Sequence, residues 1–113
     1  PQLLDPLSLR YKHECVLILM QNLVATLVNQ HKFDEAEQFC RMMLRLQRLL
    51  KGPEHLHTLA KARLLAVVLY DLGRKEEAKQ LHQETLRIRR RRYGDDHVDT
   101  VKHMAMFAAV FEE

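Results

Sequence analysis

Gly52-Pro53-Glu54-His55 decides the fold, because this stretch returns 42 residues later as Gly94-Asp95-Asp96-His97. The same offset relates three further pairs: Thr58 and Thr100, Asp34-Glu35-Ala36 and Glu76-Glu77-Ala78, and His13 and His55. Self-similarity at a fixed period of this length is typical of solenoids, in which one supersecondary unit stacks on the next and no unit buries its apolar face alone. The sequence therefore predicts a repeat protein.

Composition favours helix throughout the chain. Glycine and proline number three each and aromatic residues make up only 6% of the 113 residues, while residues with high helix propensity dominate. A chain of this length forms one compact domain. The net charge of +3 is compatible with an acidic partner or with nucleic acid, but it establishes neither.

The cysteines and the hydropathy pattern indicate where the protein resides. Cys15 and Cys40 lie within apolar helical patterns, where an unpaired cysteine behaves as a small hydrophobe, so we expect both to be reduced. No apolar run reaches the roughly 18 residues that span a bilayer, and the chain does not begin like a signal peptide. We therefore expect a cytoplasmic protein. Because the sequence begins at Pro1 without methionine, we also expect it to be part of a larger protein.

Apolar spacing and turn residues predict five helices. The first should begin between Leu9 and Lys12 and end between Asn29 and Lys32, with an apolar stripe at spacings of three and four residues. The second is expected to open at Asp34 as its N-cap, with Glu37 at the capping-box position, and to end at Gly52-Pro53. The others are expected over about 54–71, about 75–92, and from residue 97 to the end. Short connections between them favour antiparallel hairpins.

These strings resemble tetratricopeptide repeats, specifically the 42-residue variety of kinesin light chains. The resemblance is carried by Gly52-Pro53-Glu54-His55 followed by Thr58-Leu59, by Leu65-Ala66-Val67-Val68-Leu69-Tyr70, and by Gly73-Arg74-Lys75-Glu76-Glu77-Ala78. It implies an all-α, right-handed array of helical hairpins with about two and a half repeats in a single domain, residues 1–113. The repeat units would cover about 13–54, 55–96 and, in part, 97–113.

The resemblance also assigns structural positions. Ala36 and Ala78 occupy a family position where a small side chain lets two helices approach closely. Ala66 and Ala108 play the same part on the first helix of a unit, where the first unit has Val24 instead. The recurrent histidines, His13, His55 and His97, are expected to mark the same corner at the start of each first helix.

In this family the first helix of each pair lines a concave groove that holds a peptide. The corresponding groove candidates are Gln21, Asn22, Ala25 and Asn29 in the first unit, with Ile18 beside them, Arg63, Val67, Tyr70 and Asp71 in the second, and Lys102, Ala105 and Ala109 in the third. Kinesin light chains carry paired asparagines midway along this helix; the matching pairs here are Gln21-Asn22, Arg63-Leu64 and Ala105-Met106.

The basic run from Arg89 to Arg92 has three interpretations. Successive helical residues point in different directions, and cations are favoured in a last helical turn, so we expect a solvated helix end. An acidic protein partner is the alternative, and nucleic acid is the least favoured interpretation. The histidines and cysteines lack the close ligand pairs of a zinc site, and His82 is expected to be packed or hydrogen-bonded. No nucleophile motif or phosphate loop is present, so we expect no enzyme, no metal, no other cofactor and no small-molecule substrate.

The last helix is apolar on nearly every side, which predicts that it is covered by something. Further repeats of a longer parent chain would cover it, or a second copy would, through Met104, Phe107, Val110 and Phe111. The function we expect is therefore a non-catalytic protein-interaction module, a scaffold or adaptor, with kinesin-light-chain-like cargo or peptide binding as a special case. The alternatives are an oligomerisation element and a regulatory repeat segment of a signalling ATPase.

Overall fold

All secondary structure in the described part of this computed structural model is helical. The structure describes the backbone of residues 6–111 and the side chains of residues 12–98, 100–105 and 107–109. Over this range the chain forms α1 (Pro6–Asn29), α2 (Phe33–Lys51), α3 (Leu56–Asp71), α4 (Lys75–Tyr93) and α5 (Val98–Phe111). The prediction of an all-α chain with five helices is confirmed.

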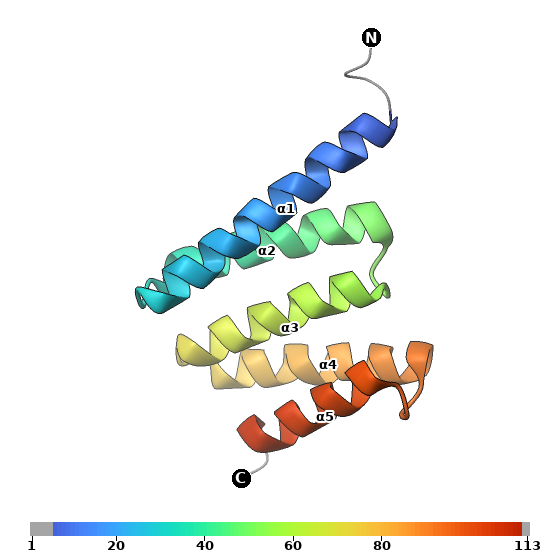
Figure 1. Cartoon of the computed structure of the whole chain (residues 1–113). Helices are drawn as coiled ribbons and strands as arrows, with labels where there is room; N and C mark the ends of the chain where they lie inside the picture. The colour runs from blue at the N-terminus through green and yellow to red at the C-terminus, as the bar shows by residue number, and fades with distance from the viewer. Residues whose placement is uncertain (1–5, 112–113) are drawn as a thin grey trace.

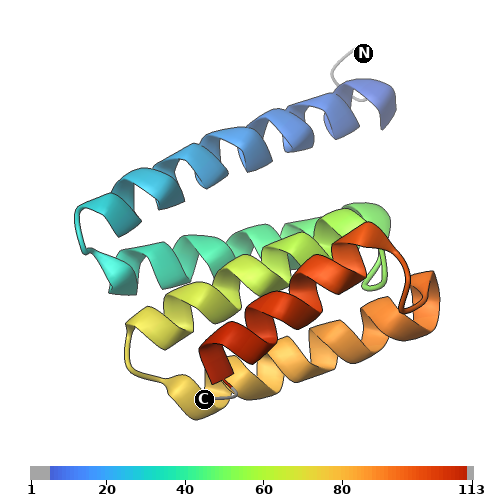
Figure 2. The same ribbon diagram turned by 60° about the horizontal axis from the view of Figure 1, so that its bottom comes forward.

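Each helix packs against the one that follows it, so that α1–α2 and α3–α4 form antiparallel hairpins in a row that ends with α5 (Figure 1). α1 crosses in front of α2 in this view, and α5 crosses in front of α4. Figure 2 shows α3 and α5 alongside each other, with α4 against both. The first helices of the hairpins therefore share one face of the array, and α2 and α4 form the other.

Glycine ends both second helices. Gly52 and Gly94 follow α2 and α4 with φ near 87°, a conformation that a residue without Cβ adopts at little cost. Their backbone N–H groups donate to the carbonyls of Arg48 and Arg90 at 2.9 Å, which satisfies a helix-end carbonyl in each case. The predicted end of α2 at Gly52 is confirmed, and the repeat reproduces it at Gly94.

Two helix starts differ from the sequence-based expectation. α2 begins at Phe33, one residue before Asp34, so Lys32 is the N-cap and makes no side-chain capping bond. Asp34 instead places its charge in the first turn, where the helix dipole favours it, and Glu37 is engaged in ion pairs rather than a capping box. α1 begins earlier than predicted, at Pro6, since proline fits a first turn in which its missing N–H leaves no bond unmade.

The three recurrent histidines do not share one position. His55 is the N-cap of α3, where its Nδ1 accepts a 3.0 Å hydrogen bond from the backbone N–H of His57. His97 directly precedes α5, with its ring 5.7 Å from that of Tyr93. His13 is exposed inside α1 because that helix begins at Pro6. The expectation of one shared corner is therefore wrong for His13.

The small-residue positions explain how closely the helices pack. Ala36 and Ala78 are fully buried, and Ala66 is 2% exposed, so a larger side chain would have to displace a neighbouring helix. Val24 is also buried at the corresponding place in the first unit. Ala108 is exposed, which corrects its expected packing role, because no described helix follows α5 to cover it.

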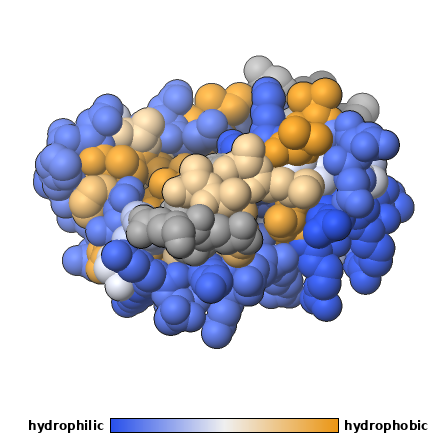
Figure 3. Space-filling view, turned by 90° about the horizontal axis from the view of Figure 1, so that it is seen from below, coloured by the Kyte–Doolittle hydropathy of each residue, from blue (hydrophilic) through white to orange (hydrophobic). Residues whose placement is uncertain are grey.

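Apolar side chains gather at the α5 end of the array (Figure 3). A cavity of about 500 Å³ opens there between α4 and α5, and Met104 and Ala108 line it. Phe107 also lines it but is only 7% exposed, because its ring stacks on that of His82 at 5.4 Å. The expectation that Phe107 needs a second copy to cover it is therefore corrected. Val110 and Phe111 lie outside the residues with described side chains, and self-association through Met104 stays a prediction.

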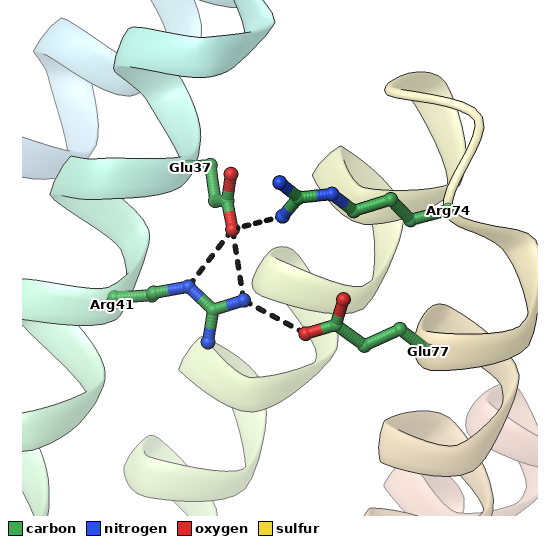
Figure 4. Close-up of polar contacts among 4 residues, drawn as sticks. All are labelled: Glu37, Arg41, Arg74 and Glu77. Carbon is green, nitrogen blue, oxygen red and sulfur yellow. Dashed lines mark hydrogen bonds and ion pairs between the residues drawn. The ribbon is translucent and has the colours of Figure 1, made fainter.

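An ion-pair network joins the two hairpins on the side of α2 and α4 (Figure 4). Glu37 on α2, 8% exposed, accepts from Arg41 Nε at 2.9 Å and from Arg74 Nη1 at 2.6 Å. Arg41 Nη2 also reaches Glu77 Oε1 on α4 at 2.9 Å, and both carboxylates raise the pKa of Arg41. The Glu37 carboxylate thus accepts a hydrogen bond from an arginine of each hairpin. These bonds fix the relative position of the two hairpins.

Candidate peptide-binding face

Two cavities open on the face that α1, α3 and α5 share. The α1–α3 pocket, about 340 Å³, has walls from α1 and α3 and a floor from α2; it is lined by Glu14, Leu17, Ile18, Gln21, Gln47, Lys51, His57, Ala60 and Lys61. The α3–α5 pocket, about 430 Å³, has walls from α3 and α5 and a floor from α4; it is lined by His55, Leu56, His57, Ala60, Arg63, Arg89, Lys102 and His103. His57 and Ala60 belong to both, so the pockets adjoin across α3.

The 42-residue offset makes the two pockets equivalent positions filled with different residues. Gln47 on the floor of the α1–α3 pocket corresponds to Arg89 on the floor of the α3–α5 pocket, and these side chains are 3% and 4% exposed. On the walls, Gln21 corresponds to Arg63, and Lys61 corresponds to His103. The repeat therefore builds the same cavity twice and changes its chemistry.

The α1–α3 pocket has mixed charge. Glu14 and Lys51 lie 4.0 Å apart at one side, and Lys61 Nζ hydrogen-bonds to Gln21 Oε1 across the gap between α1 and α3. Partial burial lowers the pKa of Lys61. Beneath it, burial raises the pKa of the Cys40 thiol to about 11, which keeps this cysteine protonated and unreactive at neutral pH.

The α3–α5 pocket carries cations and imidazoles. His103 Nε2 lies 2.9 Å from His82 Nδ1, and both side chains are 1% exposed. The pKa of His82 is lowered to about 4 and that of His103 to about 3, mainly by burial and in smaller part by the positive charges of Arg63 and Arg89. The pair is therefore neutral at pH 7, as was expected for a packed and hydrogen-bonded His82.

The structure brings only part of the predicted groove set into these pockets. Ile18 and Gln21 line the first, and Arg63 and Lys102 line the second. Asn22, Ala25 and Asn29 are exposed along α1 outside both, and Asp71 is exposed at the end of α3. Val67 and Tyr70 are half-buried, and Lys75 Nζ lies 5.4 Å from the Tyr70 ring centre.

The sequence did not predict which residues form the pocket floors, Gln47 and Arg89, or that His57 and His103 line the walls. Arg89 was assigned to a solvated arginine run, yet it is buried, while Arg90 pairs with Asp95 at 2.6 Å and Arg91 with Glu54 at 2.6 Å. The expectation of a uniformly solvated run is therefore wrong for Arg89. The signal that could have found it is the 42-residue offset, because its equivalent, Gln47, is buried on α2 and lies three residues after the buried Leu44.

Among the described residues, no helix is long and apolar enough to cross a membrane, and no three metal-ligating side chains converge on one point. Comparison with curated proteins found no match. The family model described as tetratricopeptide repeat matches residues 15–91 and, in a second and overlapping placement, residues 59–113. The two placements begin in successive first helices, α1 and α3, which agrees with the repeated pockets and the repeated glycine stops. The chain belongs to the tetratricopeptide repeat family.

Proposed function

We propose that this chain is a non-catalytic scaffold or adaptor module that holds a segment of a partner protein along the face of α1, α3 and α5. Tetratricopeptide repeats generally mediate protein–protein interactions. The observation that carries the proposal is the adjacency of the two pockets, which share His57 and Ala60. A single peptide that lies across α3 can therefore place one side chain in each pocket.

The two pockets would select different side chains. Leu17, Ile18 and Ala60 give the α1–α3 pocket an apolar wall, whereas Arg63 and Lys102 give the α3–α5 pocket a basic one. We therefore expect an apolar residue and an acidic group, a few residues apart, in the bound segment. Cargo or regulatory-peptide binding in the manner of kinesin light chains is a special case of this proposal, and it rests on the sequence resemblance alone.

The test is selection of peptides from a random library on the chain, followed by affinity measurements with two charge-reversed variants. Arg63→Glu alters the groove, and Arg45→Glu makes the same change at an exposed position of α2 that lines neither pocket. We expect Arg63→Glu to weaken the selected peptides by about tenfold or more, as removal of a charge-assisted hydrogen bond does, and Arg45→Glu to leave them unchanged. Equal affinity for both variants would refute binding at this face.

A further inference from the structure

A groove between α4 and α5 lies apart from the two pockets of the α1, α3 and α5 face. This cavity of about 500 Å³, the α4–α5 groove, has walls that include Leu86 and Arg87 of α4 and Met104 and Ala108 of α5. It shares none of its described lining residues with either pocket. Met104 and Ala108 are exposed there, among the apolar side chains that gather at the α5 end (Figure 3). Apolar grooves between helices are places where amphipathic partner helices bind.

The 42-residue offset identifies a filled copy of this groove inside the array. The groove residues Leu86, Met104 and Ala108 correspond to Leu44 of α2 and to Ala62 and Ala66 of α3. Leu44 is 5% exposed and Ala62 is 4% exposed, whereas Met104 is 36% exposed. The element that covers the inner copy is α4, whose Ala78 and Leu81 belong to the same apolar cluster as Leu44. The structure therefore shows what fits such a groove: a helix with a small residue at the closest approach.

One charged position differs between the two grooves. Glu37 on α2 accepts a hydrogen bond at 2.6 Å from Arg74, the N-cap residue of α4. The 42-residue offset places Lys79 on α4 where α2 has Glu37. A helix that occupies the α4–α5 groove as α4 occupies the inner one therefore meets an ammonium group where α4 meets a carboxylate. Opposite charges attract, so the charge that complements this position is negative.

The second helices of this chain do not match that requirement. Each has a cation as its N-cap residue, Lys32 for α2 and Arg74 for α4, four residues before a buried alanine. In the α4–α5 groove either cation would face Lys79. Ala36 and Ala78 are also fully buried, so a second copy could offer one of these helices only by opening its own hairpin. The occupant that fits is a helix of a different chain.

We propose that the α4–α5 groove binds an amphipathic helix of another protein, with an acidic residue at the position that faces Lys79. The helix lies parallel to α4, because the two ion pairs between α2 and α4 follow the same order along both helices. The spacing of Arg74, Ala78 and Leu81 in α4 gives its pattern: an acidic residue, a small residue four positions later and an apolar residue three positions after that. The proposed function uses a different face, so the two proposals are independent.

The experiment is a selection, on the whole chain, of displayed peptides of about 20 residues, enough for a helix as long as α4. Alanine and leucine are fixed at the second and third places of the pattern, glutamate and arginine are equally represented at the first, and the other positions are random. We expect glutamate to be enriched over arginine among the peptides that bind. Selection on Lys79→Glu should enrich arginine instead, because this substitution gives α4 the residue that α2 has at the equivalent position.

Affinity measurements on variants then locate the contact. Ala108→Arg places a long side chain in the groove and should weaken a selected peptide by about tenfold or more, as overfilling of a packed contact does. Ala109→Arg makes the same change at the next position, about 100° around the helix, and should leave the affinity unchanged. Both alanines are exposed, so neither substitution threatens folding, and circular dichroism checks this.

A charge exchange tests the role of Lys79. Replacing the glutamate of a selected peptide by arginine should weaken its binding to the wild-type chain by about fivefold, as loss of one ion pair predicts. The same replacement should strengthen its binding to Lys79→Glu. Because the exchange compares two peptides on one folded variant, a change in the stability of that variant does not affect the comparison.

Three results would overturn the inference: equal enrichment of glutamate and arginine, equal loss of affinity in Ala108→Arg and Ala109→Arg, or an unchanged preference in Lys79→Glu. Exposed Met104 favours weak self-association of the free chain, and the bound peptide should suppress it. Self-association that persists at peptide saturation and disappears in Ala108→Arg would assign the groove to a second copy and refute the partner helix. Weaker binding to Arg63→Glu would place the peptide on the other face and would also refute it. Each of these failures leaves the proposed function to its own test.

Discussion

Acid should unfold this protein through the buried pair His82 and His103. Burial lowers the pKa of His82 from 6.5 to about 4, and it lowers the pKa of His103 from 6.5 to about 3. The two imidazoles face each other, and the pair also faces Arg63 on α3 and Arg89 on α4. The positive charges of the two arginines disfavour protonation of either ring. Unfolding exposes both rings to water, where each binds a proton at its ordinary pKa.

The sign follows from which state binds more protons. Between pH 6.5 and the lowered pKa values, the unfolded chain is protonated at these histidines and the folded chain is not, so stability is full above pH 6.5 and falls as the pH falls. Counting a single histidine with a folded pKa near 4, the free energy of unfolding drops by about 3 kcal/mol between pH 7 and pH 4. A chain this long has roughly 6 to 17 kcal/mol in total, so the effect is a large share of it.

The assay is urea unfolding at four pH values from 7 to 4, with circular dichroism as the measure of the folded fraction. The double variant His82→Leu, His103→Leu removes both rings at similar side-chain volume, and it should lose at least about 3 kcal/mol less than the wild type over the same range. The control His13→Gln removes an exposed imidazole of α1 and should retain the wild-type slope.

Two results would refute the reasoning. A wild-type free energy of unfolding that stays flat between pH 7 and pH 4 would mean that the pair is accessible to protons in the folded state. A double variant that loses stability as steeply as the wild type would assign the acid sensitivity to the carboxylates of the ion pairs instead.

Four further predictions concern packing and surfaces. Glu37→Gln neutralises the buried carboxylate that accepts from Arg41 and Arg74 and should cost about 1 kcal/mol in urea unfolding, because charge-assisted hydrogen bonds become weaker neutral-acceptor ones. Ala78→Leu overfills a fully buried site and should cost about 1–3 kcal/mol in thermal or urea unfolding; a neutral result would contradict the close helix contact. Gly52→Ala meets no atom within 4 Å but holds φ at +87°, so backbone strain alone should cost about 1–3 kcal/mol, and an unchanged melting temperature would exclude it. Light scattering across concentration should show self-association that Met104→Asp reduces, and a wild-type monomer at high concentration would sink that prediction.

The sequence alone predicted the repeating part of this structure. Gly52 and Gly94 end their helices because only glycine adopts the required backbone at low cost, and that local rule can be seen in the letters. Helix boundaries were less certain where local signals compete. The sequence favoured Asp34 as the N-cap, but α2 begins one residue earlier, at Phe33. Glu37 makes an ion pair with Arg74 of the next hairpin instead of completing a capping box.

The candidate site depended on contacts between units, which no local pattern encodes. Ile18, Gln21, Arg63 and Lys102 line the two pockets, and their place on a first helix follows from the repeat alone. Arg89 was not predicted to line a pocket, because its neighbours in sequence are arginines that point to solvent, whereas its own direction on α4 turns it beneath α3 and α5. The sequence by itself thus determined the helices, their order and the face that the first helices share. Only the stacking of one hairpin on the next decided which charged side chains are removed from water. Burial strengthens the electrostatic interactions of those side chains, because water no longer screens them.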